Sequence, residues 1–425
     1  GCEAAWQIAG RGVPVDLYEM KPCLKTPAQH LDTMAELVCS NSLRSDRLSN
    51  AVGLLKAEMR MLDSLIMRAA DENAVPAGGA LAVDRDGFAR MVTESVLSHP
   101  LITLVPGEVT SIPEGEVVIA SGPLTSDPLA DAIAAKLGGD TTLNFFDAAA
   151  PLVTFDSVDM ESAYFASRYD KGTPDYINCP MTREEYLTFW QELVKAEEAE
   201  VHGFEDGGVF EGCMPVEVMA RRGVDTLRYG PMKPVGLRNP ATGHEPYAVV
   251  QLRRDNADGT VYNLVGFQTH LKWGEQKRVF SLIPALRDAQ YVRYGVMHRN
   301  TYLDSPRLLD RYYRLKSDPR LAFAGQMTGV EGYIESAGSG LVAGINIARK
   351  ASGKEELVFS PVCELGAMAR YVAFGALGDF QPMNANFGII EPLEKKVKGG
   401  KQARNREYAR RSLAYIESLK EQKLF

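Results

Sequence analysis

The chain has 425 residues, of which 45% are hydrophobic, and its formal net charge is −8. This length is ample for two domains with separate cores, and the acidic balance argues against uniform attraction to nucleic acid. No apolar run approaches the length of a membrane span, which predicts no membrane contact, and the scattered cysteines indicate a reducing, cytoplasmic setting. The six cysteines are scattered and form no CxxC pair, which predicts neither a metal site nor a disulfide framework.

The start of the chain reads as the second half of a dinucleotide-binding βαβ unit. Residues 1–9 predict a helix, residues 10–12 a turn, and residues 13–20 a strand that ends in the acid Glu19. In such units a glycine turn packs pyrophosphate against a helix N-terminus, and an acid about 20 residues later binds the ribose. We therefore expect a short strand and two more glycines before Gly1, although half a fingerprint alone is weak support. The residues expected to bind the cofactor here are Gly1, Glu19, Met20 and Lys21.

The next stretch alternates helical and extended patterns. Apolar residues recur at helical spacing in two segments, which polar or Pro- and Gly-rich breaks separate. The patterns predict a loop over 43–50, one helix over 51–73, a helix over 85–97 with Asp84 as its N-cap, and short strands over 102–105 and 109–112.

Two later segments repeat the turn chemistry of the chain start. Residues 116–123 read as a strand with a glycine turn, and residues 323–340 as a strand, a glycine turn and a helix start, with the helix itself over 341–350. Backbone N–H groups in such turns can meet a phosphate or a flavin ring. Each segment alone could be ordinary turn chemistry, but three in this order favour FAD. The further residues expected to bind it are Gly122, Gly325, Gln326, Gly329, Val330, Glu331 and Gly332.

The middle of the chain differs from both ends in amino-acid composition. From about residue 151 to residue 277, acidic and aromatic segments alternate with basic, Pro-rich ones. The predicted fold is therefore α/β, with a doubly wound, glutathione-reductase-like FAD-binding domain that both ends of the chain build. This domain takes residues 1–150 and 278–425, with its first strand missing from the chain, and a smaller α/β domain is inserted at 151–277.

The C-terminal segment is basic within an acidic protein. Residues 391–425 carry ten Lys or Arg and five Glu, which leaves +5 there and −13 in the rest of the chain. A basic helix can lie along phosphates, with an affinity that falls steeply as salt rises. On charge alone, a solvated helix face is the simpler interpretation.

Two cysteines have a suggestive context. Cys39 lies just beyond the first strand and loop, where the chain would pass close to a flavin. Cys213 lies between Gly212 and Pro215 with acids on both sides, which indicates a shaped loop rather than a core strand. Single cysteines are more often buried small hydrophobic residues than nucleophiles, so neither is identified as catalytic by context alone.

Several separated blocks resemble one enzyme family. Over essentially its whole length, the sequence is similar to the bacterial folate- and FAD-dependent tRNA methyltransferases that make ribothymidine in the T loop. Related flavoproteins that install carboxymethylaminomethyl groups on the wobble uridine share the FAD elements but lack most of these blocks. The one departure is the absent first strand with its glycines. The matching blocks are residues 38–43, 75–85, 176–182, 210–217, 230–237 and 294–302, and the glycine turn after Ala324.

The resemblance implies a definite chemistry. Uracil C5 is a poor nucleophile, and addition of a thiolate to C6 creates the enolate that activates it. By resemblance Cys213 is that thiolate, and Cys39 is either a supporting residue near the flavin or a packed cysteine. 5,10-Methylenetetrahydrofolate would donate the carbon, reduced FAD the two further electrons, and NADPH or NADH would restore the flavin. A site for S-adenosylmethionine is not required.

The resemblance also implies the binding residues for folate and tRNA. His298 could stack on the pterin, with Arg299 and Asn300 at its polar edges. The target uridine must leave its stack within the T loop to reach Cys213, and no obligate protein partner is apparent. The residues expected to contact tRNA are Lys233, Arg238, Arg253, Arg254, Lys272, Lys277, Arg278, Lys395, Lys396, Lys398, Lys401 and Arg404.

Two alternatives stay open at this point. One is another FAD-dependent enzyme that modifies tRNA uridine without consuming folate. The other is a flavin-binding tRNA chaperone without catalysis, which would tolerate replacement of Cys213 by serine.

Overall fold

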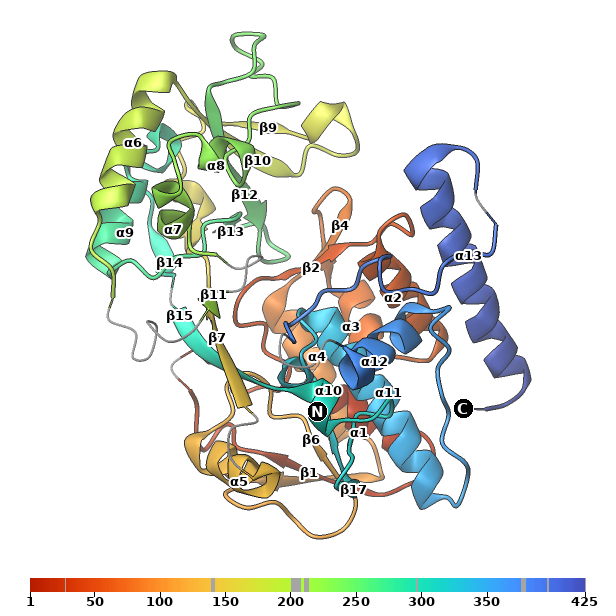
Figure 1. Ribbon diagram of the computed structural model, residues 1–425. Coiled ribbons are helices and arrows are strands. Elements are labelled where there is room, and N and C mark those ends of the chain that lie inside the picture. Colours follow the sequence, from red (N-terminus) through yellow and green to blue (C-terminus); the bar gives the residue numbers. More distant parts are fainter. Residues whose placement is uncertain are drawn as a thin grey trace.

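The structure, a computed structural model, consists of two parts. Figure 1 shows a larger part that holds both ends of the chain and a smaller part with helices α6 to α9. No helix in the described ranges is long and apolar enough to cross a membrane. The described residues are 1–26, 28–138, 142–199, 208–209, 214–295, 297–375, 380–395 and 397–424, with 142–148, 208–209 and 297–301 described by their backbone only.

Two pairs of parallel strands lie in the larger part. β1 pairs with β5 and β6 pairs with β17, and β17 also pairs antiparallel with β16. The strand expected at 102–105 is confirmed, whereas 109–112 is not a strand. Pro113 directly follows that segment, and its carbonyl accepts a hydrogen bond from the Arg320 side chain instead of from a neighbouring strand. The strands are β1 (Val15–Glu19), β5 (Ile102–Pro106), β6 (Val117–Ile119), β16 (Arg314–Leu315) and β17 (Asp318–Phe323).

Helices surround these strands. Asp84 caps α4 as expected, because its carboxylate accepts a hydrogen bond from the Gly87 N–H at 2.6 Å. The single helix expected over 51–73 is wrong, since the chain turns and the Ser64 hydroxyl caps a second helix by accepting from the Met67 N–H. The helices are α1 (Cys2–Ala9), α2 (Ala51–Met61), α3 (Leu65–Glu72), α4 (Arg85–Leu97), α5 (Asp127–Leu137), α10 (Ser305–Leu308), α11 (Tyr333–Ala351), α12 (Glu364–Phe374) and α13 (Gly400–Glu421).

Helix α11 begins at Tyr333 and not at residue 341, where the sequence placed it. The expectation failed because Gly338 and Gly340 resemble turn residues. In the structure both lie inside the helix: a Cβ at Gly338 would be 3.2 Å from the Leu365 side chain, whereas a Cβ at Gly340 would be in ordinary contact with the Ala4 nitrogen at 3.7 Å. Small residues in a helix can thus mark a close crossing as well as a turn.

Of two further three-stranded sheets, one belongs to the larger part and the other lies where the larger part joins the smaller one. β2 pairs with β4, so the expected loop over 43–50 is wrong at its start. The sheet of β11, β7 and β15 runs between the two parts, as Figure 1 shows. The strands are β2 (Ser42–Ser45), β3 (Ala74–Val75), β4 (Ala80–Val83), β7 (Thr142–Ala148), β11 (Gly208–Val209) and β15 (Met297–Leu303).

The smaller part is an antiparallel sheet with helices beside it. The strand order is β14-β8-β13-β12-β10-β9. Its core includes the fully buried rings of Tyr186, Phe189, Phe267 and Phe280, each of which contributes about 1.5–3 kcal/mol by burial. The elements are β8 (Leu152–Thr154), β9 (Tyr164–Ala166), β10 (Tyr176–Met181), β12 (Ala248–Arg254), β13 (Val261–Leu264), β14 (Tyr291–Arg293), α6 (Arg183–Lys195), α7 (Val216–Arg221), α8 (Thr226–Tyr229) and α9 (Trp273–Phe280).

Candidate active site

Helices α1 and α11 cross closely and run in the same direction. A Cβ at Gly340 would face Glu3 and Ala4, and one turn later a Cβ at Gly344 would face Ala4 and Gln7. Both N-termini therefore point toward the same side of the molecule. Within the described residues neither helix has a side-chain cap, so the first backbone N–H groups of both are free for an anion.

The carboxyl ends of the parallel strands lie at the same edge. Glu19 ends β1, and Ala120 directly follows β6 and lies 3.9 Å from where a Cβ on Gly1 would be. Gly122 then turns the chain with φ +74°. Ligands of open α/β sheets bind outside the carboxyl ends of the strands. A pyrophosphate at the N-terminus of α1 and a ribose near Glu19 fit this edge.

The glycine turn after β17 leads directly into α11. Gly325, Gly329 and Gly332 have φ values of +86°, +80° and +116°, which favour glycine over other residues. The Glu331 N–H donates to the Met383 carbonyl at 2.9 Å, which fixes the turn. Val330 is fully buried. The turn therefore offers backbone groups, and not the Val330 side chain, to a flat ligand such as flavin.

Cys39 lies beside the start of α11. Its backbone N–H donates to the Tyr333 hydroxyl at 2.8 Å. Burial raises the pKa of Tyr333, so the hydroxyl stays protonated. The guanidinium groups of Arg85 and Arg293 interact electrostatically with Cys39, and burial followed by the charge of Arg85 lowers the pKa of Arg293.

A buried polar network joins the Cys39 segment to β12 of the smaller part. Arg85 Nε lies 2.8 Å from Asp255 Oδ2. Arg253 Nε donates to Asn41 Oδ1 at 3.2 Å, and its Nη2 donates to Ser40 Oγ at 2.8 Å. Because Arg253 is only 7% exposed, it orients this segment and is not available for tRNA phosphates.

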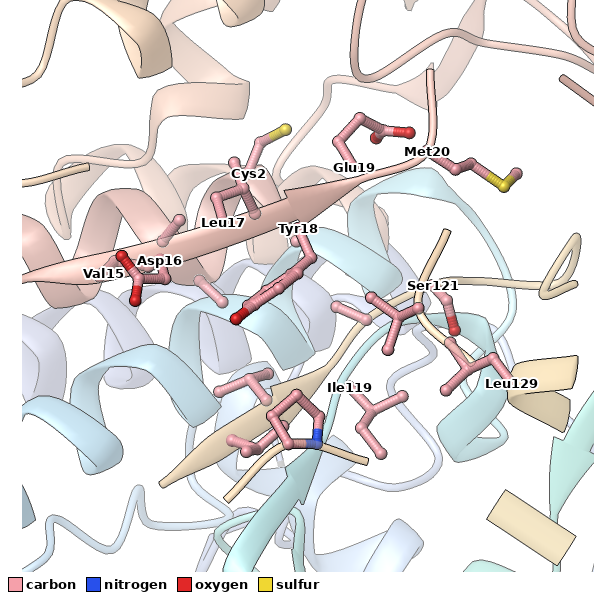
Figure 2. Close-up of a pocket in the computed structure, with 18 of the residues that line it drawn as sticks. Cys2, Val15, Asp16, Leu17, Tyr18, Glu19, Met20, Ile119, Ser121 and Leu129 are labelled. Carbon is pink, nitrogen blue, oxygen red and sulfur yellow. The ribbon is translucent and has the colours of Figure 1, made fainter. Parts of the chain in front are cut away.

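A cavity of about 500 Å³ separates β1 from β6. Figure 2 shows Leu17 and Tyr18 of β1 on one side, Ile119 on the other, and Glu19 at the end of β1. The Glu19 carboxylate accepts from the Lys21 N–H at 3.0 Å. The Lys21 ammonium is buried, where it donates to the Thr33 carbonyl, so it does not reach the cavity.

Comparisons with known proteins agree with this geometry. Residues 1–355 match the family described as Glucose inhibited division protein A (GidA). A Bacillus mycoides protein named methylenetetrahydrofolate–tRNA-(uracil-5-)-methyltransferase TrmFO is 60% identical over 98% of this chain and 96% of its own length. An Acetivibrio thermocellus protein of the same name is 59% identical over 98% of this chain and 95% of its own length. This chain belongs to the TrmFO proteins of the GidA family.

A solved structure supports the fold assignment of this chain. Aquifex aeolicus GidA superimposes with a TM-score of 0.70 and 16% identity, covering 100% of this chain and 73% of that chain. At this identity the likeness concerns the fold. The family resemblance and the α/β, FAD-domain fold predicted from the sequence are thereby confirmed.

Some expected site residues of the TrmFO chain lie outside the described part. Cys213 and Lys396 are not among the described residues. His298, Arg299 and Asn300 lie on β15, which is described by its backbone only. Their roles remain predictions.

The expected tRNA contacts divide by exposure. Arg254 is half-buried, and Arg253 is buried in the network described above. Lys272 pairs with Glu197, and Arg278 pairs with Glu192, so part of their charge is neutralised. The exposed members are Lys233, Arg238, Lys272, Lys277, Arg278, Lys395, Lys398, Lys401 and Arg404.

The structure adds residues that the sequence interpretation did not single out. Tyr333 holds the Cys39 backbone, and Arg85 pairs with Asp255 across the two parts. Tyr333 follows the last glycine of the turn, which was a usable signal for a residue at the cofactor edge. Arg85 lies within a family-like block but was interpreted only as part of a helix.

Proposed function

We infer that this protein methylates C5 of a T-loop uridine in tRNA, with 5,10-methylenetetrahydrofolate as carbon donor, FAD as cofactor and NADPH or NADH as reductant. One observation carries this conclusion: relatives with that enzyme name are 56–60% identical over nearly the whole chain. We further propose that it acts in the cytoplasm, on the T arm.

The cofactor edge supports specific contacts to FAD. The N–H groups at the start of α1, after Gly1, would hold the pyrophosphate, and the Glu19 carboxylate would accept from the ribose hydroxyls. The backbone of the turn from Gly325 to Gly332 would face the flavin. When bound, FAD supplies the two electrons that bring the donated carbon to the methyl level.

Two cysteines have proposed roles in catalysis. The Cys213 thiolate would form a bond to C6 of the uracil, which makes C5 nucleophilic toward the donated carbon. Loss of the C5 proton and cleavage of the S–C6 bond would then restore both the base and the thiolate. Cys39, beside Tyr333 and two guanidinium groups, would be held at the flavin side of the site.

The proposed domain limits follow from strand pairing. β1 and β6 each pair on one edge in the described structure and face each other across the 500 Å³ cavity. We propose that a further parallel strand fills this space and completes the FAD-binding sheet. The inserted domain would extend from residue 151 to about residue 293, since a limit at 277 would divide α9 and separate β14 from its partner β8.

The surface proposed for tRNA consists of exposed cations from both parts. Lys233 and Arg238 lie in the smaller part, and Lys401 and Arg404 lie on α13. Replacing Lys233 and Lys401 by glutamate should weaken tRNA binding and make it less dependent on salt, while the flavin spectrum stays unchanged. Equal loss of tRNA binding and FAD would contradict this surface.

A comparison of methyl donors tests the function. The protein with bound FAD and NADPH would be given an unmodified tRNA transcript, with the label either in methylenetetrahydrofolate or in S-adenosylmethionine. We expect labelled ribothymidine only from the folate. Absence of label from folate, with a normal flavin spectrum, would favour another flavin-dependent modification of tRNA uridine.

A further inference from the structure

Three aromatic rings form a stack on the smaller part. Tyr294 stacks on Trp273, with ring centroids 5.7 Å apart and planes at 13°, and on Tyr291, with centroids 4.8 Å apart and planes at 14°. Trp273 is the first residue of α9, and Tyr291 is the first residue of β14. We call these three residues the aromatic ladder. Figure 1 shows α9 and β14 close to each other, near the upper end of β15.

One end of the aromatic ladder is open to solvent. Trp273 is 62% exposed, although its indole stacks on Tyr294. Leaving so large an apolar ring in water forgoes the stabilisation that burial would give. Next to it, a Cβ at Gly274 would meet no atom within 4 Å. The ladder therefore ends in an accessible flat surface on which one more ring could stack.

A cavity lies beside the two tyrosines of the ladder. Its volume of about 520 Å³ falls in the range of small-molecule sites and can hold a nucleoside. Lys277, Arg278 and Arg287 line it. Arg278 pairs with Glu192 and Glu275. Arg287 interacts electrostatically with Asp159, whereas Lys277 forms no salt bridge in the described part of the chain. Asp288 and Gln290 add hydrogen-bonding groups to the same wall. Flat rings, cationic side chains and polar groups thus meet in one place.

We propose that the aromatic ladder and this cavity bind an unstacked base of the tRNA substrate together with a neighbouring phosphate. Single-stranded and loop regions of RNA are bound in this way, by stacking on aromatic side chains and by cations along the backbone. A T-loop uridine must leave its stack to react, which disturbs the bases beside it. The inference rests on tRNA as the substrate, but it does not depend on the methyl donor.

The ladder also lies next to the strand that carries the proposed folate residues. Tyr294 follows β14, and β15, with His298, begins three residues later. A base held on Trp273 would therefore stack, through Tyr294, on the connection between β14 and the strand of the proposed folate residues. This arrangement would help to orient the T loop for the nucleophile.

The first test is tRNA binding by Trp273 variants. The affinity of the FAD-loaded protein for an unmodified tRNA transcript would be measured by filter binding at several salt concentrations, without folate. Trp273→Ala should weaken binding roughly 5- to 150-fold, the equivalent of about 1–3 kcal/mol for one stacked base. Trp273→Phe should retain most of the affinity. The salt dependence should be the same for all three proteins, because no charge changes.

Lys277→Ala gives the complementary test. It should weaken binding and also reduce the slope of log affinity against log salt by about 0.7–0.9, as expected for one lost phosphate contact. Phe374→Ala is the matched control, since Phe374 is also 62% exposed and its ring contact in the described part of the chain is with the Arg311 guanidinium, 5.4 Å from the ring centroid. Its tRNA affinity should equal that of the wild type.

Several results would overturn the inference. Trp273→Ala with wild-type tRNA affinity would do so, as would an equal loss in Phe374→Ala. Slower reduction of the flavin by NADPH in Trp273→Ala, with tRNA binding intact, would identify the ladder as a site for the nicotinamide cofactor instead. If Trp273 variants lose tRNA affinity as expected but the wild type transfers no label from folate, the ladder is supported and the proposed methyl donor is refuted.

Discussion

Two glycines on α11 lie one turn apart, face the same helix and should respond oppositely to alanine. A Cβ at Gly344 would lie 2.7 Å from the Ala4 carbonyl oxygen and 3.0 Å from Gln7 Cβ, whereas at Gly340 the nearest atom, the Ala4 nitrogen, is 3.7 Å away. Alanine stabilises a helix by about 1 kcal/mol relative to glycine. Gly340→Ala should therefore raise the free energy of unfolding by up to that amount.

At Gly344 the steric cost should exceed this gain. The atoms in the way include the backbone of α1, so the two helices must separate, and overpacking of this kind costs about 1–3 kcal/mol. The net expectation for Gly344→Ala is a loss of up to about 2 kcal/mol. Because we propose that the N-terminus of α1 binds the pyrophosphate, displacement of α1 should also weaken FAD binding.

Urea unfolding followed by circular dichroism, with FAD titration of each variant, measures both effects. We expect Gly340→Ala to unfold at higher urea and bind FAD as the wild type does, and Gly344→Ala to unfold at lower urea and bind FAD less tightly. Equal stability and equal FAD affinity of the two variants would refute the close parallel crossing of α1 and α11.

Two further predictions concern buried charges. Arg85→Met or Asp255→Leu alone should cost about 3–5 kcal/mol in urea unfolding, because each leaves a buried charge unpaired. The double variant should lose much less stability than the two single variants together. If the losses of the single variants simply add up in the double variant, Arg85 and Asp255 do not form the ion pair. Burial opposes protonation of His270, but Glu198 and Glu217 outweigh it and raise its pKa to about 9. Because the pKa of His270 is higher in the folded than in the unfolded protein, its protonation stabilises the fold fully below about pH 6.5, and this stabilisation is lost as the pH rises toward 9. The free energy of unfolding should therefore fall by up to about 3 kcal/mol between these pH values. A free energy of unfolding that does not change over this range would contradict the two ion pairs.

Local patterns in the sequence predicted much of the secondary structure at the proposed cofactor edge. The helix and strand at the chain start, the N-cap Asp84 and the glycine turn before α11 all depend on neighbouring residues, whose spacing carries the signal. The start of α11 was misplaced because Gly338 and Gly340 lie where this helix contacts other helices, Gly338 at Leu365 of α12 and Gly340 at Ala4 of α1, and spacing along the sequence does not show such contacts. The break between α2 and α3 was missed because apolar residues keep helical spacing across it, from Met59 through Leu62 to Leu65 and Ile66.

Contacts between distant segments could not be predicted from spacing. The bond from Cys39 to Tyr333 spans 294 positions, and the one from Arg253 to Asn41 spans 212. Arg253 was expected at the tRNA surface because it belongs to a basic pair, but only the packing of β12 against the Cys39 segment determines that it is buried. The aromatic ladder likewise depends on how α9 meets β14.

The central claim is folate-dependent methylation of tRNA through Cys213. The most direct measurement is transfer of label from methylenetetrahydrofolate to the T-loop uridine of an unmodified tRNA transcript, with the FAD-loaded wild type and Cys213→Ala side by side. The account predicts labelled ribothymidine with the wild type and none with Cys213→Ala, at equal flavin content. Equal label from both proteins would contradict the assignment of Cys213 as the nucleophile.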